Sequence, residues 1–450
     1  MDTNVNSKRR FLFVLFEGGG NVPPMLGLAR RLVEGGHSVR VIGEPANEAE
    51  IRAVGCEFSP YTRAPHRFDK SAESTFMDDY VGKSSVQALF RFIDKVLAGP
   101  ALEYAQDVLE ELQARPVDLV VVNEFLFGGL FAAEKLGIPS VMVTPGTYNF
   151  YAPNFPPPGM TPLGGPLGWL RDKFYGKMFG RLLAHALPGL KRARQGLGLS
   201  EGIDVLGYLD QLERILVLTT PAFEFMADFA PNMLYTGPII DDPVLVEPWQ
   251  SPWPQDDARP LVVVSFSTTY QKHEAILQRV INAFSDLPVR ALVTVGPAID
   301  AQRLTAPPNV VLRAFVSHAQ VFPHASAVIT HAGHGTVIRA LAQGVPLICM
   351  PVGRDQPNNA ARVVARGAGI RLSPAAETKA IRQAVQTLLA DGRYRQNARK
   401  LADAIQKDAH STAAISELER IASREGRQSA APSTSTAPGL TWQTEMSTHS

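Results

Sequence analysis

The chain has very little cysteine: Cys56 and Cys349 are the only two among its 450 residues. They lie far apart in the sequence, and Cys349 belongs to an apolar run, so neither a disulfide framework nor a zinc site is expected. This usage suits the reducing cytosol, and a cytoplasmic protein is expected.

Long apolar runs are also missing. None approaches the roughly 18 residues that a transmembrane helix needs, and residues 11–16 are too short for the core of a signal peptide.

An excess of either charge is absent as well. Lys and Arg number 44 and Asp and Glu 43, for a formal net charge of +1. Such a balance provides no general attraction to nucleic acid, and no nucleic-acid partner is expected. No Asp-x-Asp triplet occurs, and no histidine stands at metal-ligand spacing from carboxylates. A metal-independent protein without a cofactor is therefore expected.

Short apolar runs alternate with helical patterns along most of the chain, which predicts an α/β fold of two Rossmann-like, doubly wound domains. Examples are FLFVLF at 11–16, DLVVVN at 118–123 and LVVVSF at 261–266. The stretch rich in Pro and acids before residue 261 is typical of a linker. We expect an N-terminal domain at 1–240, a linker at 241–260 and a C-terminal domain at 261–424. The Ser-, Thr- and Pro-rich tail at 425–450 is expected to be disordered.

A segment rich in Pro and Gly, residues 148–168, carries Phe150, Tyr151, Phe155 and Met160. Two interpretations stay open, because long irregular loops are either functional or disordered. The segment is a mobile wall over an apolar ligand, or it is an exposed loop whose aromatic side chains hold it to the core.

The most informative part of the sequence is SAVITHAGHGTVIRALAQGVPLICMPVGRDQPNNAARVVARGAGI, residues 326–370. Its layout is strand, Gly-rich turn, helix, strand, loop and helix. The turn between the first strand and helix contains His331, Gly333, Gly335 and Thr336. Free backbone N–H groups and the positive end of the helix dipole converge there, which predicts an anion site. A structural strand-to-helix turn is the alternative, because a glycine pattern alone is weak evidence of function.

A second element, Asp355 with Gln356, follows the next strand. Both side chains can accept hydrogen bonds from sugar hydroxyls. The carboxyl ends of parallel strands are where open α/β sheets place their ligands. The two elements together predict a site for a diphosphate-linked sugar.

These segments resemble the family-one, GT-B-fold glycosyltransferases, a group that includes bacterial antibiotic and sterol UDP-sugar transferases. The resemblance covers nearly the whole chain and is strongest in HAGHGT, ALAQGVPLICMP and DQPNNAARV, with GGGNVPPMLGLARRLVEGGHSV at the N-terminus. It implies two Rossmann-like domains that face each other across a cleft, with the acceptor in the first domain and the nucleotide sugar in the second.

The resemblance also implies roles for individual residues. The diphosphate is expected at His331, Gly335 and Thr336, the sugar at His334, Asp355 and Gln356, the base and ribose at His318, and the phosphates again at Ser267 and Thr268. For His318 a buried histidine that is satisfied by backbone groups is the alternative. His37 is expected to be structural.

The chain departs from the family at the catalytic base. Most members use a His after the first strand, oriented by an Asp after a later one, whereas this chain has Asn21 and Asn123 there. An amide cannot accept a proton at neutral pH. Glu17 or Glu124 is a substitute base if burial raises its pKa. The remaining explanations are an acidic acceptor that needs no base, a chain that acts only as a binder or with an activating subunit, and a shifted alignment.

A second departure concerns the donor, because Arg339 occupies the position of a ribose-binding Glu. The choice between UDP and dTDP sugars therefore stays open. The sequence predicts an inverting glycosyltransferase that moves the sugar to an apolar small-molecule acceptor. A nucleotide-sugar epimerase and a donor-binding regulator with a degenerate base are the two alternatives.

Overall fold

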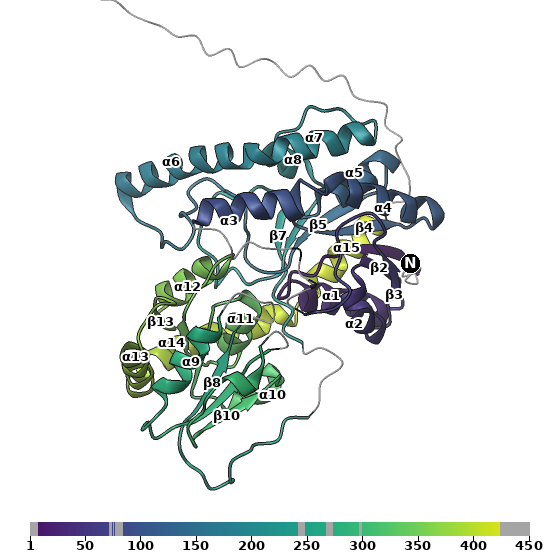
Figure 1. The fold of residues 1–450 in the computed structure, drawn as a ribbon. Helices are drawn as coiled ribbons and strands as arrows, with labels where there is room; N and C mark the ends of the chain where they lie inside the picture. The colour runs from purple at the N-terminus through teal and green to yellow at the C-terminus, as the bar shows by residue number, and fades with distance from the viewer. Residues whose placement is uncertain are drawn as a thin grey trace, which may run out of the picture.

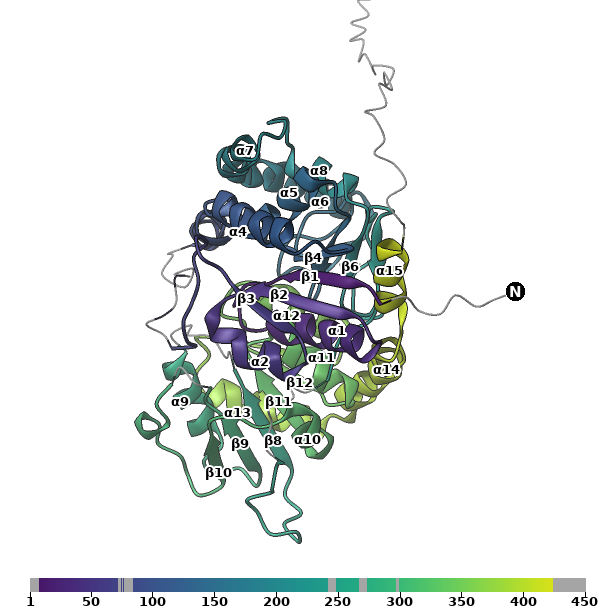
Figure 2. The same cartoon turned by 90° about the vertical axis from the view of Figure 1, so that its right-hand side faces the viewer.

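The computed structural model describes residues 8–71, 74, 76, 84–241, 248–266, 273–296 and 299–423. The expected disordered tail and the two residues expected at the phosphates, Ser267 and Thr268, lie outside these ranges. Within them the chain forms two parallel β-sheets with helices on both faces of each (Figures 1 and 2). The predicted α/β class and two-domain architecture are confirmed.

The first sheet has seven strands in the order β3-β2-β1-β4-β5-β6-β7. Its strands are β1 (Arg10–Val14), β2 (Ser38–Gly43), β3 (Glu57–Pro60), β4 (Leu119–Asn123), β5 (Ser140–Thr144), β6 (Ile215–Val217) and β7 (Met233–Tyr235). Its helices are α1 (Val22–Glu34), α2 (Glu48–Ala53), α3 (Ser85–Phe92), α4 (Ala101–Ala114), α5 (Phe127–Leu136), α6 (Gly165–Leu183), α7 (Leu187–Gly196) and α8 (Val205–Gln211).

The second sheet has six strands in the order β10-β9-β8-β11-β12-β13. They are β8 (Leu261–Ser265), β9 (Arg290–Thr294), β10 (Val310–Arg313), β11 (Ala327–Thr330), β12 (Leu347–Cys349) and β13 (Gly369–Arg371). The helices are α9 (Glu274–Ala283), α10 (His318–Val321), α11 (His334–Ala342), α12 (Gln356–Ala365), α13 (Thr378–Ala390), α14 (Gly392–Ala409) and α15 (Ala413–Ala422).

The central strands are continuous apolar runs because both faces of each sheet are covered. Every residue of β4 and of β8 is buried, and the pairs between strands are parallel. A parallel sheet that is buried on both faces needs such uninterrupted hydrophobic strands. Two hydrophobic clusters flank each sheet.

The strand order places the sites of interest. In each sheet the chain first adds strands on one side of its first strand and then crosses back to add the remaining strands on the other side. The loops that follow neighbouring strands therefore diverge between β1 and β4 and between β8 and β11. Ligands of doubly wound sheets bind at this switch point, beyond the carboxyl ends of the strands. Glu17 and Asn21 follow β1, Asn123 and Glu124 end β4, and His331 follows β11.

The last helix does not stay with the domain that precedes it. Leu418 and Ile421 of α15 pack in the same cluster as Phe11 and Phe13 of the first sheet, and the Glu419 carboxylate lies 2.9 Å from His37 Nε2. Residues 413–422, at the end of the range 261–424 expected for the C-terminal domain, thus bury their apolar face on the N-terminal sheet. The structural role expected for His37 fits this contact.

A buried ion pair joins the two domains. Arg362 of α12 bonds through Nε and Nη2 to Glu224, which follows β6, and both side chains are almost fully buried. The guanidinium also lies between the rings of Phe155 and Phe225, at 5.5 and 4.9 Å from their centroids. Such stacking on planar rings is a property of Arg rather than Lys.

Candidate active site

The turn after β11 is shaped by a glycine and a strained alanine. Ala332 has a φ of 71°, a left-handed conformation that is uncommon for residues other than glycine. Gly333 precedes α11, and a Cβ atom there would lie 2.6 Å from His331 Nε2. The absence of a side chain at Gly333 therefore allows the imidazole to lie against the turn.

We expect Gly333→Ala to displace the His331 ring and to weaken nucleoside diphosphate binding. The physical reason is that the added Cβ atom would lie 2.6 Å from His331 Nε2. Only a movement of the imidazole can relieve this contact. Isothermal titration with UDP or dTDP measures the loss. Gly392→Ala is the matched control, because a Cβ atom at Gly392 meets nothing within 4 Å. Unchanged affinity in Gly333→Ala would place the diphosphate elsewhere.

His331 is buried and electrically neutral. Burial, followed by the nearby charges of His273 and Arg354, lowers its pKa to about 3, while a hydrogen bond with the Ser265 backbone acts in the opposite direction. The ring lies 6.1 Å from that of Phe266. A neutral imidazole has one N–H. The ring bonds to the Ser265 backbone, and its Nδ1 also lies 3.4 Å from the Thr330 hydroxyl. With its one N–H engaged in these contacts, the ring needs a second proton to donate to an anion as well.

His334 connects the two domains at the start of α11. Its Nε2 lies 3.0 Å from the Thr219 hydroxyl, beyond β6 of the first sheet, and its ring packs against Gly146 beyond β5. Its backbone N–H bonds to the Asp355 carboxylate. The residue expected beside the sugar therefore also joins the carboxyl edges of the two sheets.

Thr219→Val removes the hydroxyl partner of the buried His334 ring and leaves a polar nitrogen unsatisfied. An unsatisfied buried group costs about 1 to 3 kcal/mol. We expect the free energy of unfolding to fall by this amount in chemical denaturation, with the slope unchanged. The matched control is Thr305→Val on the exposed rim, for which no loss is expected. A stable Thr219→Val variant would show that this contact is dispensable.

Asp355 and Gln356 begin α12 and are held in different ways. The Asp355 carboxylate accepts from Asn359 Nδ2 at 2.7 Å, and burial raises its pKa. Gln356 Oε1 accepts the backbone N–H groups of Val352 and Gly353, at 2.7 and 3.0 Å. The acid faces the donor turn, whereas the amide oxygen shapes the loop that precedes it.

Asn359 holds these parts together and was missed in the sequence. It bonds through Nδ2 to Asp355 and to the Ala332 carbonyl at 3.0 Å, and the Thr147 hydroxyl donates to its Oδ1 at 3.2 Å. Its place one helical turn after Asp355 was the available signal. Thr147 lies after β5, so this is a further contact between the sheet edges.

His318 lies at the carboxyl end of β8, beside its last residue. Its Nε2 is 3.0 Å from the Ser265 hydroxyl and its ring stacks on Phe322 at 4.4 Å. Burial lowers its pKa to about 3, with smaller contributions from Arg339 and His331.

The guanidinium of Arg339 bonds to the carbonyls of Gly335, Ile240 and Asp241. Arg339 therefore fixes the end of the N-terminal domain to α11. Gly335 and Thr336 are half-buried in the first turn of that helix.

On the other side of the interface, the residues after β1 turn toward their own loop. Asn21 Nδ2 donates to the Phe16 carbonyl at 2.9 Å, and Asn21 Oδ1 accepts from the Gly18 N–H at 3.0 Å. Glu17 accepts from the Gly19 N–H at 2.7 Å and from Asn47 Nδ2 at 2.5 Å. Asn21 is thus part of its own turn, whereas Glu17 also links that turn to Asn47, which follows β2.

The residues at the end of β4 differ. Asn123 is fully buried, and its Nδ2 finds no hydrogen-bond partner among the described residues. The Glu124 carboxylate accepts from Asn149 Nδ2 at 3.0 Å and from the Thr144 hydroxyl at 3.1 Å. Burial, with a smaller contribution from the charge of Asp355, raises the pKa of Glu124 to about 8, although the hydrogen bonds from Asn149 and Thr144 act in the opposite direction. Of the four expected catalytic residues, Glu124 is the one coupled electrostatically to the donor side.

The Pro- and Gly-rich segment bridges the domains. Its Gly159 donates to Asn358 Oδ1 at 2.7 Å and accepts from Arg371 at 2.8 Å. Phe150 and Phe155 are buried, whereas Met160 is exposed. The segment thus lies against α12, the helix that Asp355 precedes, and α6 begins within its last residues.

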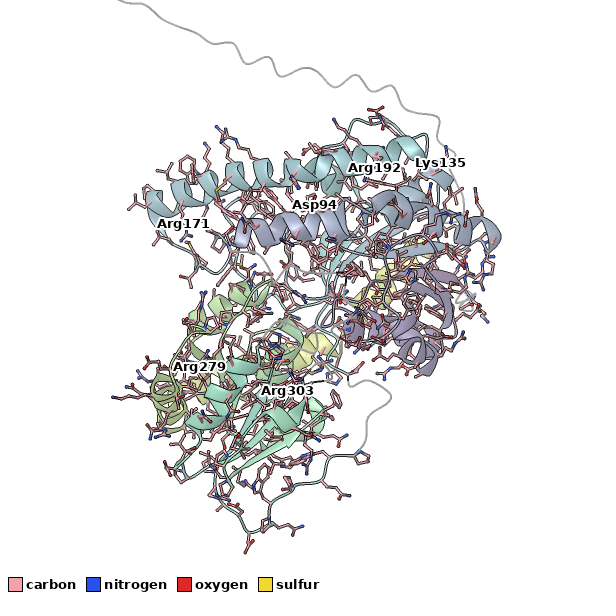
Figure 3. All side chains as sticks on the ribbon, viewed as in Figure 1. Asp94, Lys135, Arg171, Arg192, Arg279 and Arg303 are labelled. Atoms are coloured by element: carbon pink, nitrogen blue, oxygen red, sulfur yellow. The ribbon has the colours of Figure 1, made fainter. Side chains whose placement is uncertain are left out.

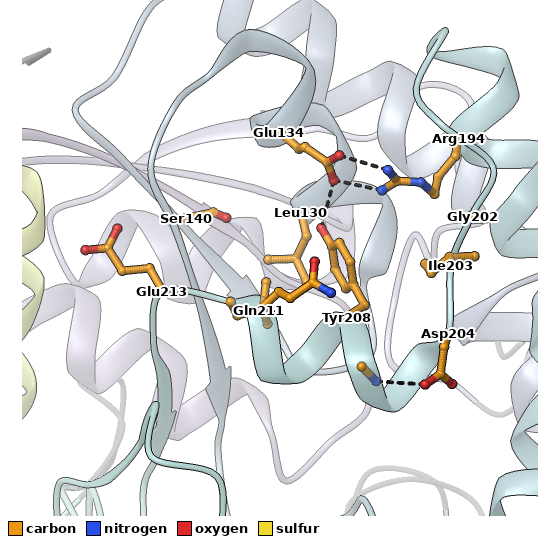
Figure 4. A pocket seen from close by; sticks show the side chains of 12 residues that line it. Leu130, Glu134, Ser140, Arg194, Gly202, Ile203, Asp204, Tyr208, Gln211 and Glu213 are labelled. Atoms are coloured by element: carbon orange, nitrogen blue, oxygen red, sulfur yellow. Dashed lines mark hydrogen bonds and ion pairs between the residues drawn. The ribbon is translucent and has the colours of Figure 1, made fainter. Parts of the chain in front are cut away.

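A surface cavity of about 580 Å³ lies away from this site (Figure 4). Its polar side chains satisfy one another: Arg194 bonds to Glu134 through both terminal nitrogens, at 2.8 and 2.9 Å, and the Tyr208 hydroxyl bonds to the same acid. No residue of the donor turn lines it. The converging loops at the two sheet edges remain the candidate site.

Comparison with known proteins identifies similar sequences and structures. Residues 273–421 match the family described as erythromycin biosynthesis protein CIII-like, C-terminal domain. The chain is 28% identical to 4'-demethylrebeccamycin synthase of Lentzea aerocolonigenes, over 88% of this chain and 95% of that protein. It is 28% identical to demethyllactenocin mycarosyltransferase of Streptomyces fradiae, over 85% and 80%. The crystal structure of CalG4, the calicheamicin glycosyltransferase, superposes with a TM-score of 0.72 at 26% identity and covers 94% of this chain and 100% of that one.

Proposed function

Because the chain is a family-one glycosyltransferase of the GT-B fold, we propose that it inverts the anomeric carbon of a nucleotide-diphosphate sugar in a single displacement. The acceptor oxygen forms a bond to that carbon as the bond to the diphosphate breaks. The acceptor proton passes to the protein, and the nucleoside diphosphate leaves toward the turn after β11.

The observation that carries this proposal is the convergence of three elements at one interface. The turn at His331, the Asp355 carboxylate and the Glu124 carboxylate lie at the carboxyl edges of the two sheets, and the charge of Asp355 contributes to the raised pKa of Glu124. An anion site, a group for sugar hydroxyls and a base of raised pKa are the parts that the displacement needs.

Glu124 is the general base in this proposal. A Glu with an ordinary pKa near 4.3 is a weak base for an alcohol, whereas a pKa of about 8 is close to the operating range. Asn149 and Thr144 hold the carboxylate in place. Asn21 is engaged in its own turn and Glu17 holds that turn to Asn47, so structural roles are assigned to both.

We further propose that the charge on the leaving diphosphate is stabilised without a metal ion. The free N–H groups at the start of α11 and the helix dipole supply positive potential there. Within the described ranges no three His, Cys, Asp or Glu side chains are grouped as metal ligands would be. EDTA is expected to leave turnover unchanged, and loss restored by Mg²⁺ would contradict this part.

The donor is a UDP or dTDP sugar, and the acceptor is an apolar natural-product-like molecule. The names of the two bacterial relatives, a rebeccamycin synthase and a lactenocin mycarosyltransferase, support this acceptor class. Arg339 bonds to backbone carbonyls around the linker, so the ribose 2′-hydroxyl lacks the carboxylate partner that would favour UDP.

The test is a mass-spectrometric screen of the purified chain with UDP-glucose, UDP-GlcNAc and dTDP-glucose against phenols, macrolides, sterols and aromatic acids. A glycoside whose anomeric configuration, read by NMR of the purified product, is inverted relative to the donor supports the proposal. Activity that arises only after Asn21→His would instead favour a donor-binding protein that has lost its base. No product and no donor binding in any combination would overturn the assignment.

A further inference from the structure

Helix α6 carries its large apolar side chains on the solvent side. Leu167, Leu170 and Phe174 are 75%, 58% and 69% exposed, whereas Gly168 and Asp172 face the protein. A surface helix normally buries its apolar stripe and exposes its polar face. The N-terminal half of α6 therefore has the opposite arrangement.

The exposed residues form one stripe. Leu167, Leu170, Phe174 and Met178 follow one another at steps of three or four, the spacing that places residues on one face of a helix, and each is exposed, as is Leu163 just before the helix. Trp169 and Met160 beside them are also more than half exposed. A contiguous apolar patch of this kind marks an interaction surface.

The opposite face of α6 rests on the body of the N-terminal domain. A Cβ atom on Gly176 would lie 2.2 Å from Cζ of Tyr151, so the helix packs closely through its glycines. Figure 1 shows α6 along the outer edge of that domain, and Figure 3 places Arg171 at its far end. The stripe thus points outward.

Basic residues flank the stripe. Lys173, Lys177 and Arg181 are exposed, and none of the three forms an ion pair with an acid among the described residues. The single acid of α6, Asp172, is buried and bonds to Arg171 at 2.7 Å. Lys173 Nζ lies 4.6 Å from the Trp169 ring. The face that α6 presents is consequently both apolar and positively charged.

We propose that α6 docks this protein on an anionic lipid bilayer, with the helix lying in the plane of the interface. An apolar stripe, an interfacial Trp and flanking basic residues are the features of helices that bind membrane surfaces. No helix in the described part of the chain has the length and hydrophobicity to cross a bilayer. A second copy of the chain is a poor occupant, because pairing two such stripes brings like charges together.

The test is vesicle flotation of the full chain with phosphatidylcholine vesicles and with vesicles that also contain phosphatidylglycerol. We expect binding to the anionic vesicles, weakened by salt. The substitutions Lys173→Gln, Lys177→Gln and Arg181→Gln combined are expected to weaken it by roughly 10², because each basic residue near an anionic surface contributes about a factor of five. Leu170→Glu with Phe174→Glu is expected to abolish it. The matched control is Phe68→Glu, an exposed aromatic outside α6.

Two results would overturn the inference: equal binding to neutral and anionic vesicles, or unchanged binding of the α6 variants. Light scattering on the same samples tests for one more contrary result. In that result the wild type is a dimer that does not bind vesicles, and Leu170→Glu with Phe174→Glu dissociates the dimer. Glycosyl transfer to a water-soluble phenol is measured in parallel, in the absence of vesicles. Activity without vesicle binding would refute this surface and leave the proposed transferase function intact.

Discussion

Replacing Glu124 with glutamine is expected to lower kcat/KM for glycosyl transfer by a factor of about 10² to 10⁴, the usual contribution of a general base. Glutamine keeps the shape of the side chain and its bond with the Thr144 hydroxyl but cannot accept the acceptor proton. Initial rates with saturating donor measure the loss, and circular dichroism of the variant checks the fold.

The pH profile gives an independent readout of the same residue. Burial raises the pKa of Glu124 to about 8, and only the ionised carboxylate accepts a proton. The rate of the wild type is therefore expected to rise with pH and to level off above about 8, since kcat/KM reports groups of the free enzyme. Glu124→Gln should remove this dependence.

Glu17→Gln is the matched control, because Glu17 is also a buried Glu beyond the end of a strand of the first sheet. Its partners are Gly19 and Asn47, so its replacement is expected to keep the pH dependence. Loss of that dependence in Glu17→Gln, with its retention in Glu124→Gln, would transfer the role of the base to Glu17.

The strands and the donor turn could be predicted from sequence because each depends on local composition. Runs such as DLVVVN are apolar enough to require burial on both faces, and this requirement fixes a parallel sheet. The glycines around His331 occur where a strand meets a helix. At such a position the backbone has to turn tightly, and the free N–H groups of the helix can bind an anion. Neither prediction needed information from distant residues.

The contacts between the domains could not be predicted in this way. Nothing near Leu418 indicates that α15 packs on the first sheet, since its apolar spacing suits any partner. The bonds of Asn21 within its own turn and of Glu17 to Gly19 and Asn47 depend on loop geometry, which the residue types leave open. Arg362 and Glu224 are far apart in sequence, and their buried pair is visible only in the fold.

On the donor side, His331→Ala is expected to reduce turnover by 10² or more, the scale of losing one hydrogen-bond donor to the developing negative charge. The ring lies against the turn that leads to α11, where the leaving diphosphate accumulates charge. Because the Ser265 backbone already takes one N–H, the ring has to gain a proton to bond to the diphosphate. The negative charge of the diphosphate favours that protonation.

This argument predicts proton uptake on binding. In the unliganded protein the pKa of His331 is about 3, so the ring is neutral at pH 7. Titration calorimetry of UDP or dTDP in buffers of different ionisation enthalpy measures protons bound per site. We expect uptake in the wild type and none in His331→Ala. The control His324→Ala, whose ring lies against Trp249, is expected to behave as the wild type. Uptake that persists in His331→Ala would assign the proton to another group, and turnover near the wild-type rate in that variant would place the diphosphate away from this turn.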